Sequence, residues 1–405
     1  MARIVMKFGG TSVANSERIM AVADRVKAAA ANGDQIAVVV SAMAGVTDQL
    51  IGYVAQIGLR EDGREYDVVV STGEQVTSGL LALACKRIGV PARSWLGWQL
   101  PVHTDSMHSK ARIERIDTAG IEQTLDDGWV AVVPGFQGLG PDGRVTTLGR
   151  GGSDTSAVAL AAALGADRCD IFTDVDGVYT ADPRIVTKAR KLSKIAYEEM
   201  LESASLGAKV LQTRSVELAM KQRVRLQVLS SFADVPGTLV VDEDEIVEQQ
   251  LVTGIAYSRN EAKMTLLGVP DKPGVAAAIF GPLAEAGINV DMIVQNVSED
   301  GKVTDLTFTL AETDLEQATE VLRAREAELG FRDLRPDPEV AKVSVIGIGM
   351  RSHAGVAQTM FRALAERGIN IQVISTSEIK VSVLIGAEYT ELAVRTLHSA
   401  YGLDV

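Results

Sequence analysis

The sequence predicts an α/β protein in which one large parallel-sheet domain is followed by two smaller repeated modules. Short β-branched runs alternate with helix-like stretches over residues 1–241, as is typical of a mostly parallel sheet with helices on both faces. An internal repeat occupies the remainder. The length of 405 residues, with 46% hydrophobic and 23% charged residues, suits a multidomain globular protein.

The apolar runs of the first part define five predicted strands. They are Ile4–Met6, Ile36–Val40, Val68–Val70, Val130–Val133 and Asp170–Phe172. A loop rich in glycine and small polar residues follows each run. Ligands of open α/β sheets bind at the carboxyl ends of the strands, so we expect these five loops to line one crevice.

The C-terminal part contains the repeat. Gly274–Ile293 and Gly355–Ile374 share 11 identities in 20 positions, and each copy reads strand, helix, strand, strand, helix. Small βαββαβ modules of this kind are ferredoxin-like α/β sandwiches. The first copy can gain its last strand near Phe331–Leu334, whereas the second copy ends at Val405.

The missing strand of the second copy suggests an insertion. The apolar stretch Leu251–Ala256 precedes the first copy and can supply that strand, so we expect the first module to be inserted into the second. The acidic run Asp242–Glu245 marks a domain boundary. The predicted domains are residues 1–241, residues 263–336, and residues 251–258 together with 340–405.

Composition excludes several classes of protein. The formal net charge is −13, which disfavours binding to nucleic acid or to an anionic membrane. The N-terminus lacks the apolar core of a signal peptide, and no run approaches ~18 uninterrupted apolar residues. The only cysteines are Cys85 and Cys169, too few for a disulfide scaffold. We expect a cytoplasmic protein with no nucleic-acid or membrane partner.

A glycine-rich loop, Thr147–Ser156, precedes an Ala/Leu-rich helix. Glycines allow close approach of a ligand, and a helix N-terminus binds anions. The alternative is a tight turn capped by Ser153 or Asp154. The flanking Arg150 and Asp154 favour a functional loop, because a simple turn requires neither.

Two further motifs fit phosphate chemistry. Lys7 precedes Gly9 and Gly10 at the end of the first strand, where it can neutralise a transferring phosphoryl group; the alternative is a strand-end lysine that reaches water. The loop Thr173–Arg184 lacks the ligand spacing of an EF-hand. It fits a nucleotide-holding loop better, with a plain polar turn as the alternative.

The four histidines lie outside these loops, and no zinc spacing is present. A reaction that needs a histidine base is therefore not expected.

Five motifs, in this order, resemble those of the aspartate kinases of the amino-acid kinase superfamily, and the repeat resembles their C-terminal ACT modules. The kinase motifs are Lys7–Ser12, Val40–Met43, Ser71–Glu74, Thr147–Ser156 and Phe172–Arg184; the ACT strings are Asp271–Gly274, Gln295–Ser298 and Ile374–Glu378. The resemblance covers essentially the whole chain. It implies the amino-acid kinase fold followed by two ACT modules.

The implied reaction transfers the γ-phosphoryl group of ATP to the side-chain carboxylate of L-aspartate, giving 4-phospho-L-aspartate. This is the first step of lysine, threonine and methionine biosynthesis. A carboxylate with a pKa near ~4 is ionised at neutral pH, so the nucleophile needs no general base. Positioning and charge stabilisation can supply the catalysis.

The resemblance also implies site residues. The catalytic residues would be Lys7, Asp154 and Lys209. The nucleotide would contact Lys7, Gly9, Gly10, Thr173, Asp174, Tyr179, Asp182, Arg184 and Lys209. Aspartate would contact Ser41, Thr47, Glu74, Arg150, Gly151, Gly152 and Ser153. We expect Mg²⁺ to arrive with ATP, without a dedicated protein metal site.

ACT modules of this family bind amino acids, so the resemblance implies feedback inhibition by lysine, threonine or both. The effector residues would be Asp271, Lys272, Pro273, Gly274, Asn289 and Gln295 in the first copy, and Ile369, Asn370, Thr376 and Ser377 in the second. The alternative is that these are ordinary strand–helix turns. Paired ACT modules imply a homo-oligomer, a dimer or larger, and some relatives add a short regulatory subunit made from an internal start.

Two other functions remain open at the level of sequence. One is a kinase of the same fold that acts on glutamate, acetylglutamate or a nucleotide. The other is an ACT amino-acid sensor without catalytic activity, which intact Lys7, Asp154 and Lys209 disfavour. The net charge divides unevenly, with −1 on residues 1–241 and −12 on residues 242–405, so the acidity says little about the predicted active site.

Overall fold

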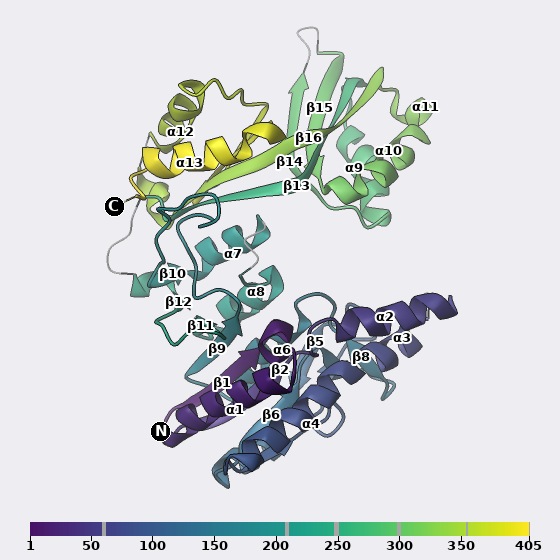
Figure 1. Cartoon of the computed structure of the whole chain (residues 1–405). Helices are drawn as coiled ribbons and strands as arrows, with labels where there is room; N and C mark the ends of the chain where they lie inside the picture. Colours follow the sequence, from purple (N-terminus) through teal and green to yellow (C-terminus); the bar gives the residue numbers. More distant parts are fainter. Residues whose placement is uncertain (59–61, 207–209, 247–250, 298–300, 354, 405) are drawn as a thin grey trace. The chain divides into compact units, whose positions relative to one another are not determined.

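The computed structural model describes the chain except for residues 59–61, 207–209, 247–250, 298–300, 354 and 405 (Figure 1). The chain forms two compact units. The first contains Met1–Val178, Lys191–Ser205 and, after a short break at Leu206, which belongs to the second unit, residues up to Glu248. The second contains Tyr179–Arg190 and Gln249–Val405.

The first unit is built on an eight-stranded sheet of order β10-β12-β11-β9-β1-β2-β6-β3. Every strand pair is parallel except β11 with β12. The mostly parallel sheet predicted from the sequence is thus confirmed. Its strands are β1 (Arg3–Phe8), β2 (Gln35–Val40), β3 (Ala92–Ser94), β6 (Val130–Pro134), β9 (Arg168–Thr173), β10 (Lys194–Ala196), β11 (Leu226–Ser230) and β12 (Thr238–Val241).

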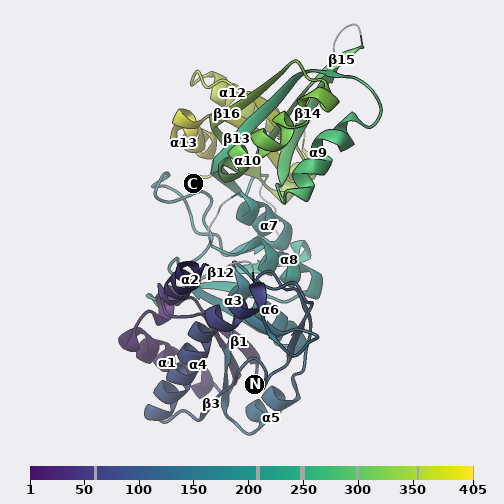
Figure 2. The same cartoon turned by 90° about the vertical axis from the view of Figure 1, so that its right-hand side faces the viewer.

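Helices cover both faces of this sheet, as Figures 1 and 2 show. Side chains alternate along each strand, so Met6 and Val38 pack with α1 (Ser16–Ala31) and α4 (Thr72–Arg87) on one face. Val5, Val39 and their neighbours pack on the other face with α5 (Ala119–Asp126), α6 (Gly152–Ala163) and α8 (Thr213–Gln222). α7 (Tyr197–Ser205) contributes Tyr197 and Met200 to the same core. Burial on both faces explains why the strands are continuous apolar runs.

A four-stranded sheet of order β5-β4-β7-β8 also belongs to the first unit. Its strands are β4 (Val102–Thr104), β5 (Ile113–Ile116), β7 (Gln137–Leu139) and β8 (Val145–Thr147). α2 (Val46–Ile57) and α3 (Gly63–Val70) complete the unit.

The strand predicted at Val68–Val70 is wrong, because these residues end α3. Asp62 caps this helix by accepting a hydrogen bond from the Arg64 amide at 3.1 Å. Asp67 and Val70, three residues apart, are buried, whereas the side chain of Val68 is 41% exposed. Burial thus follows the helical period, and a β-branched run of three residues is too short to reveal a strand.

The second unit contains a six-stranded sheet of order β14-β15-β13-β16-β18-β17, with helices packed against it. Its strands are β13 (Gly254–Pro270), β14 (Val290–Val297), β15 (Val303–Leu310), β16 (Asp333–Ile346), β17 (Val373–Thr376) and β18 (Lys380–Gly386). Its helices are α9 (Val275–Glu285), α10 (Leu315–Arg323), α11 (Glu326–Leu329), α12 (Val356–Ala365) and α13 (Thr390–Ala400). The order of elements in both copies matches the predicted repeat.

The long strands β13 and β16 run through both copies of the repeat. The first part of β13, Gly254–Ser258, pairs antiparallel with Lys342–Ile346 of the second copy. Further along β13, Leu266 and Leu267 pair with Leu334 and Asp333 at the end of the first copy. This pairing supports the expected insertion of the first module into the second.

One segment packs differently from the expected domain division. Tyr179–Arg190 was expected in the domain of residues 1–241, but it belongs to the second unit. Ala181 and Val186 lie in a core cluster with Leu397 and Leu403 of the C-terminus.

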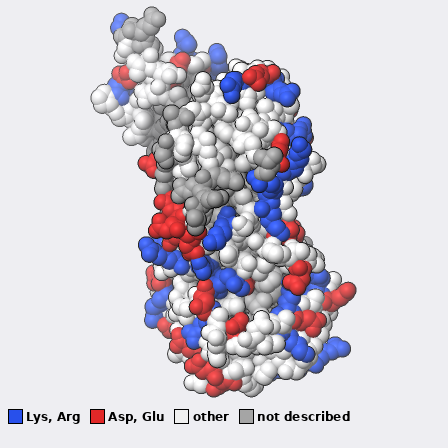
Figure 3. Space-filling view, turned by 90° about the vertical axis from the view of Figure 1, so that its left-hand side faces the viewer, with Lys and Arg blue, Asp and Glu red and all other residues white. Residues whose placement is uncertain are grey.

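The stretch Gly63–Arg87 is long and apolar enough, by length and composition alone, to cross a membrane. It comprises α3 and α4, and 56% of its most apolar window is buried. α4 packs on the large sheet through Leu81 and Cys85, as the core helix of a globular domain does. Charged side chains of both signs are intermixed on the face of the first unit seen in Figure 3.

Candidate active site

Loops from several elements meet at the carboxyl ends of β1, β2 and β6. The Ser41 amide donates to the carbonyl of Phe8 at 3.0 Å, and the Gly135 amide donates to the carbonyl of Val40 at 2.9 Å. These bonds join the loops that follow the three strands. The residues Ser71–Glu74 adjoin the same edge from a junction between two helices, since a methyl group at Gly73 would lie 2.7 Å from Cβ of Ala42.

Lys7 and Asp154 form the charged centre of this edge. The Lys7 ammonium lies 2.5 Å from a carboxylate oxygen of Asp154, and both side chains are 11% exposed. Lys7 is the penultimate residue of β1, whereas Asp154 lies in the first turn of α6. A lysine held so closely is oriented, and a carboxylate in the first turn is favoured by the helix dipole.

Glycines allow the backbone to come close around this pair. A methyl group at Gly9 would lie 3.4 Å from the Lys7 nitrogen, and one at Gly10 would lie 3.0 Å from the Ala42 carbonyl oxygen. Gly151 caps α6 with a φ of 70°, in the left-handed region that favours glycine. Amide groups at a helix N-terminus can bind an anion, and Asp154 in the first turn of α6 contacts Lys7.

Glu74 is the most unusual carboxylate of this edge. It lies in the first turn of α4, its residue is 3% exposed, and its Oε2 has no hydrogen-bond partner among the described residues. Burial raises the pKa of Glu74 to about 7, against the lowering effect of hydrogen bonds to the backbone of Ala42 and of Glu74. A buried carboxylate with a free oxygen can accept an ammonium group.

The other residues expected to bind aspartate belong to the same loops. Ser41 and Thr47 are half-buried, and Thr47 lies in the first turn of α2. Ser153 is buried, and a methyl group at Gly135 would lie 2.9 Å from its hydroxyl oxygen. Arg150 is exposed, as a cation awaiting a carboxylate would be.

Two supports of the glycine-rich loop escaped the sequence analysis. The fully buried Asp67 accepts hydrogen bonds from the Thr147 amide and hydroxyl, at 3.0 and 2.5 Å. Arg214 on α8 donates to the Leu148 carbonyl at 2.8 Å. Burial lowers the pKa of Arg214. Both residues fix the strand that leads into the loop, and no spacing in the sequence signals either contact.

The residues expected to hold the nucleotide are divided between the two units. Thr173 donates to Asp174 at 3.1 Å within the first unit. Arg184 pairs with Asp182 at 2.7 Å within the second, and this contact lowers the pKa of Asp182 and raises that of Arg184. Tyr179 is half-buried. Lys209 lies outside the described residues.

In the C-terminal unit, one pocket collects most of the effector residues predicted in the first copy. Asp271, Lys272, Pro273, Gly274 and Gln295 line a cavity of about 360 Å³. Asn289 is exposed and lies outside that lining. In the second copy Ile369 is buried in the core, whereas Asn370, Thr376 and Ser377 are exposed.

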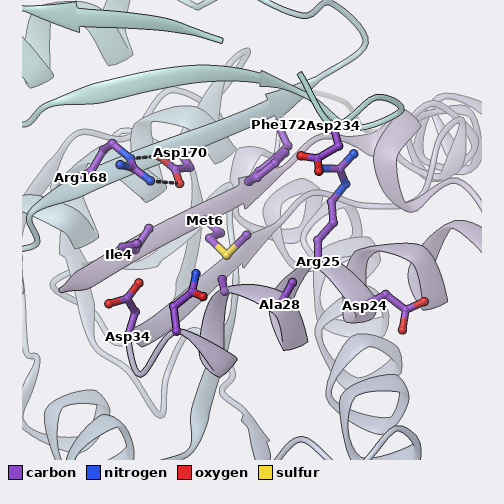
Figure 4. Close-up of a pocket in the computed structure, with 12 residues that line it drawn as sticks. Ile4, Met6, Asp24, Arg25, Ala28, Asp34, Arg168, Asp170, Phe172 and Asp234 are labelled. Atoms are coloured by element: carbon purple, nitrogen blue, oxygen red, sulfur yellow. Dashed lines mark hydrogen bonds and ion pairs between the residues drawn. The ribbon is translucent and has the colours of Figure 1, made fainter. Parts of the chain in front are cut away.

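A larger cavity, of about 480 Å³, lies along β1, β9 and α1 (Figure 4). Ile4, Met6 and Phe172 line it together with Arg25 and Asp170, and Asp170 is paired with Arg168 at 2.5 Å. Its lining contains none of the predicted site residues. We place the candidate site at the strand ends instead, because Lys7 pairs with Asp154 there and the buried Glu74 contacts the backbone of Ala42 in the loop after β2.

Family models agree with this architecture. The model of the amino acid kinase family matches residues 2–230, and models of the ACT domain match residues 263–327 and 343–401.

Relatives that align over the full length of the chain identify the branch of the family. The chain is 58% identical over 405 residues to an aspartate kinase of Stutzerimonas stutzeri, covering 100% of this chain and 98% of that protein. It is also 58% identical over 406 residues to an aspartokinase of Pseudomonas aeruginosa, with the same coverage.

Among solved structures, aspartokinase III of E. coli in complex with aspartate and ADP superposes with a TM-score of 0.80 at 29% identity, covering 98% of this chain and 99% of that one. The complex of the same enzyme with lysine and aspartate gives a TM-score of 0.77, also at 29% identity, with 98% of each chain covered. The chain therefore belongs to the amino acid kinase family, and within it to the aspartate kinases with two C-terminal ACT domains.

Proposed function

We propose that this protein phosphorylates the side-chain carboxylate of L-aspartate with ATP, giving 4-phospho-L-aspartate, the first step towards lysine, threonine and methionine. The observation that carries the proposal is the buried Lys7–Asp154 pair at 2.5 Å beside the N-terminus of α6. The aspartate and ADP bound in the E. coli neighbour support the choice of substrates.

The residues suit an attack of the aspartate carboxylate on the γ-phosphoryl group without a general base. The acceptor carboxylate is already ionised, so the protein must hold two anions close together and neutralise the charge that separates them. Lys7 would contact the transferring phosphoryl group, and Asp154 would hold Lys7 in place. Lys209, predicted to assist, would add a second positive charge. The backbone at Gly9, Gly10, Gly151 and Gly152 allows phosphate oxygens to approach amide groups.

Aspartate would be held at its other end. Glu74 would take the ammonium group, which restores the charge balance of a buried carboxylate. Arg150 would pair with a carboxylate, and Ser41, Thr47 and Ser153 would add hydrogen bonds. Thr173, Asp174, Tyr179, Asp182 and Arg184 would hold the nucleotide.

Mg²⁺ would enter with ATP. Among the described residues, no group of three or more His, Cys, Asp or Glu is placed to hold a metal ion. Mg²⁺ commonly keeps several waters and binds through substrate phosphates with one or two carboxylates. Its role would be to neutralise phosphate charge during transfer.

The regulatory proposal rests on the C-terminal unit. We propose that lysine, threonine or both bind the pocket lined by Asp271–Gly274 and Gln295, together with the equivalent turn of the second copy. The lysine bound in the E. coli neighbour supports an amino-acid effector. Inhibition requires that the effector bind an inactive state more tightly than the active one.

The organisation of the chain completes the proposal. The domains would be residues 1–241, residues 263–336, and residues 251–258 with 340–405, the first ACT module being inserted in the second. The ACT modules would pair in a homo-oligomer in the cytoplasm, with a short regulatory subunit from an internal start as a further partner. Neither nucleic acid nor a membrane would be needed.

The test is ADP release by the purified protein with aspartate, glutamate or acetylglutamate as acceptor. We expect activity with aspartate. Preference for another acceptor would identify a different kinase of this fold, and no turnover with any acceptor would favour an amino-acid sensor.

The catalytic assignment is tested by replacing each member of the ion pair. Lys7→Ala and Asp154→Ala should each lower kcat by about 10²-fold or more, because an oriented charge at the transition state is lost. Lys27→Ala, at an exposed lysine on α1, is the matched control. Near-normal turnover in a folded Lys7 or Asp154 variant would remove that residue from the catalytic set.

A further inference from the structure

The segment Tyr179–Arg190 carries three of the residues proposed to hold the nucleotide, yet its contacts lie in the second unit. The Ile255 amide of β13 donates to the Thr180 carbonyl at 2.8 Å. The Arg190 guanidinium donates to the Leu403 carbonyl at 3.0 Å. Both ends of the segment are thus attached to the C-terminal unit.

A buried hydrogen-bond chain lies at the centre of this attachment. The Thr180 hydroxyl is 2.9 Å from Nε2 of His398, and Nδ1 of His398 is 2.7 Å from a carboxylate oxygen of Asp404. Thr180 and His398 are both fully buried.

Donor and acceptor roles along the chain follow from chemistry. The Asp404 carboxylate can only accept, so Nδ1 of His398 donates to it; in the tautomer that carries its proton on Nδ1 alone, Nε2 is left as an acceptor. The Thr180 hydroxyl then donates to Nε2 while it accepts from the Arg190 amide at 2.9 Å. Ser399 also donates to Asp404 at 2.8 Å, and these bonds lower the pKa of Asp404.

We propose that His398 is a positioning residue of the nucleotide site: through Thr180 it fixes the segment that holds the nucleotide to the C-terminal module. The inference rests on the proposed role of Tyr179, Asp182 and Arg184 in nucleotide binding. It adds that their placement is set by the last helix of the chain and not by the kinase domain alone.

The neighbouring contacts favour this role. Asp182 follows Thr180 by two residues and accepts a hydrogen bond from Tyr257 of β13 at 3.2 Å. The segment continues directly into Val178 and Lys191 of the first unit. A movement of α13 against β13 would therefore displace Asp182 and its partner Arg184.

Two pairs of variants test the proposal in the full-length protein. Thr180→Val replaces the hydroxyl by a methyl group, whereas Thr180→Ser keeps it. His398→Asn keeps a donor for Asp404 but loses the acceptor for Thr180, whereas the carbonyl oxygen of His398→Gln can reach the position of Nε2. Ser382→Ala is the control, because it breaks another buried hydroxyl pair of the same unit, with Ser344 at 2.6 Å.

The readouts are the calorimetric Kd for ATP and the KM values for ATP and aspartate. We expect Thr180→Val and His398→Asn to weaken ATP binding by about three- to tenfold, the effect of one lost hydrogen bond. The KM for aspartate and the kcat at saturating ATP should stay within about twofold of wild type. Thr180→Ser should match the wild type, and His398→Gln should weaken ATP binding less than His398→Asn.

Unchanged ATP affinity in folded Thr180→Val would overturn the proposal, as would an equal loss in Ser382→Ala. If His398→Asn fails to fold, the smaller change Thr180→Val decides the outcome. Calorimetry with ATP needs no acceptor, so the inference is tested even if aspartate is not phosphorylated. Absence of aspartate-dependent ADP release, by contrast, would count against the proposed function only.

Discussion

In the folded protein, burial of Glu74 disfavours the charged form of its carboxylate. Its pKa is raised from 4.5 to about 7 by burial, so the folded state binds this proton more tightly than the unfolded state does. Protonated Glu74 therefore contributes its full stabilisation of the folded state at pH values below the pKa of the unfolded chain. This contribution is lost as the pH rises through 7. An ammonium group placed beside Glu74 would remove this penalty.

Glu74→Gln should therefore stabilise the free protein at alkaline pH. Two to three pKa units correspond to about 3 kcal/mol, which the neutral side chain would recover at pH 8. The gain should shrink towards pH 5, where Glu74 is protonated in the folded state. Thermal unfolding of both proteins at several pH values measures this; equal midpoints at pH 8 would contradict the assignment.

The same residue should make aspartate binding depend on pH. As the pH falls from 8 to 6, Glu74 becomes protonated and loses its attraction for the ammonium group, so the KM for aspartate should rise while that for ATP changes little. In Glu74→Gln the KM for aspartate should be about tenfold or more higher and nearly independent of pH. A Glu74→Gln profile that still follows the wild type would assign the titration to another group.

At the level of elements, the N-terminus of α4 makes one especially close contact. A methyl group at Gly73 would lie 2.7 Å from Cβ of Ala42, in the loop after β2, whereas one at Gly79 on the same helix would meet no described atom within 4 Å. The approach at Gly73 brings Glu74 to the strand ends.

Gly73→Ala and Gly79→Ala should therefore have opposite effects. Alanine stabilises an exposed helix position by about 1 kcal/mol relative to glycine, which we expect at Gly79. At Gly73 the contact with Ala42 should displace α4, lower stability and raise the KM for aspartate by about tenfold. Urea unfolding and steady-state kinetics of both variants provide the comparison; two variants that behave alike would refute the contact.

Strands could be predicted from the sequence where their burial on both faces of the sheet requires a long run of apolar residues. Ile36–Val40 is a five-residue apolar run and forms β2, with burial on both faces of the sheet. Val68–Val70 resembles it in composition but ends a helix, in which the buried Asp67 accepts a hydrogen bond from the Thr147 hydroxyl. A β-branched run of three residues is too short to distinguish a strand from a helix end, and the contact of Asp67 with Thr147 across 80 residues has no signature in the sequence.

At the scale of the whole molecule, the net negative charge is concentrated in the C-terminal part of the chain. Residues 242–405 carry a net charge of −12, against −1 for residues 1–241. If the ACT modules pair as proposed, two strongly acidic surfaces approach each other.

Self-association should therefore strengthen with salt. Raising the ionic strength from about 0.02 to about 0.3 M shortens the Debye length several-fold and screens this repulsion. Sedimentation velocity at several protein concentrations should then show a lower dissociation constant at the higher salt. Dissociation promoted by salt would instead indicate that attractive charge pairs hold the subunits together.

The candidate-site residues could be predicted from the sequence where they belong to short motifs of neighbouring residues. Lys7, the glycines and the loop at Arg150–Asp154 carry their roles in short motifs, and the structure brings Lys7 and Asp154 together. The supports are not local. Arg214 reaches Leu148 across 66 residues, and His398 reaches Thr180 across 218, so neither pair has a signature in the sequence.

The long reach of the Thr180–His398 contact has a consequence for protein synthesis. The ribosome makes the N-terminal domain first, and that domain can begin to fold while the rest is still being translated. His398 lies 218 residues after Thr180, so it is made long after the segment that it contacts. Nascent chains and products of premature termination would thus contain Lys7 and Asp154 but lack the anchor of Tyr179–Arg190. On the proposal above, full affinity for ATP would be reached only after α13 has been made.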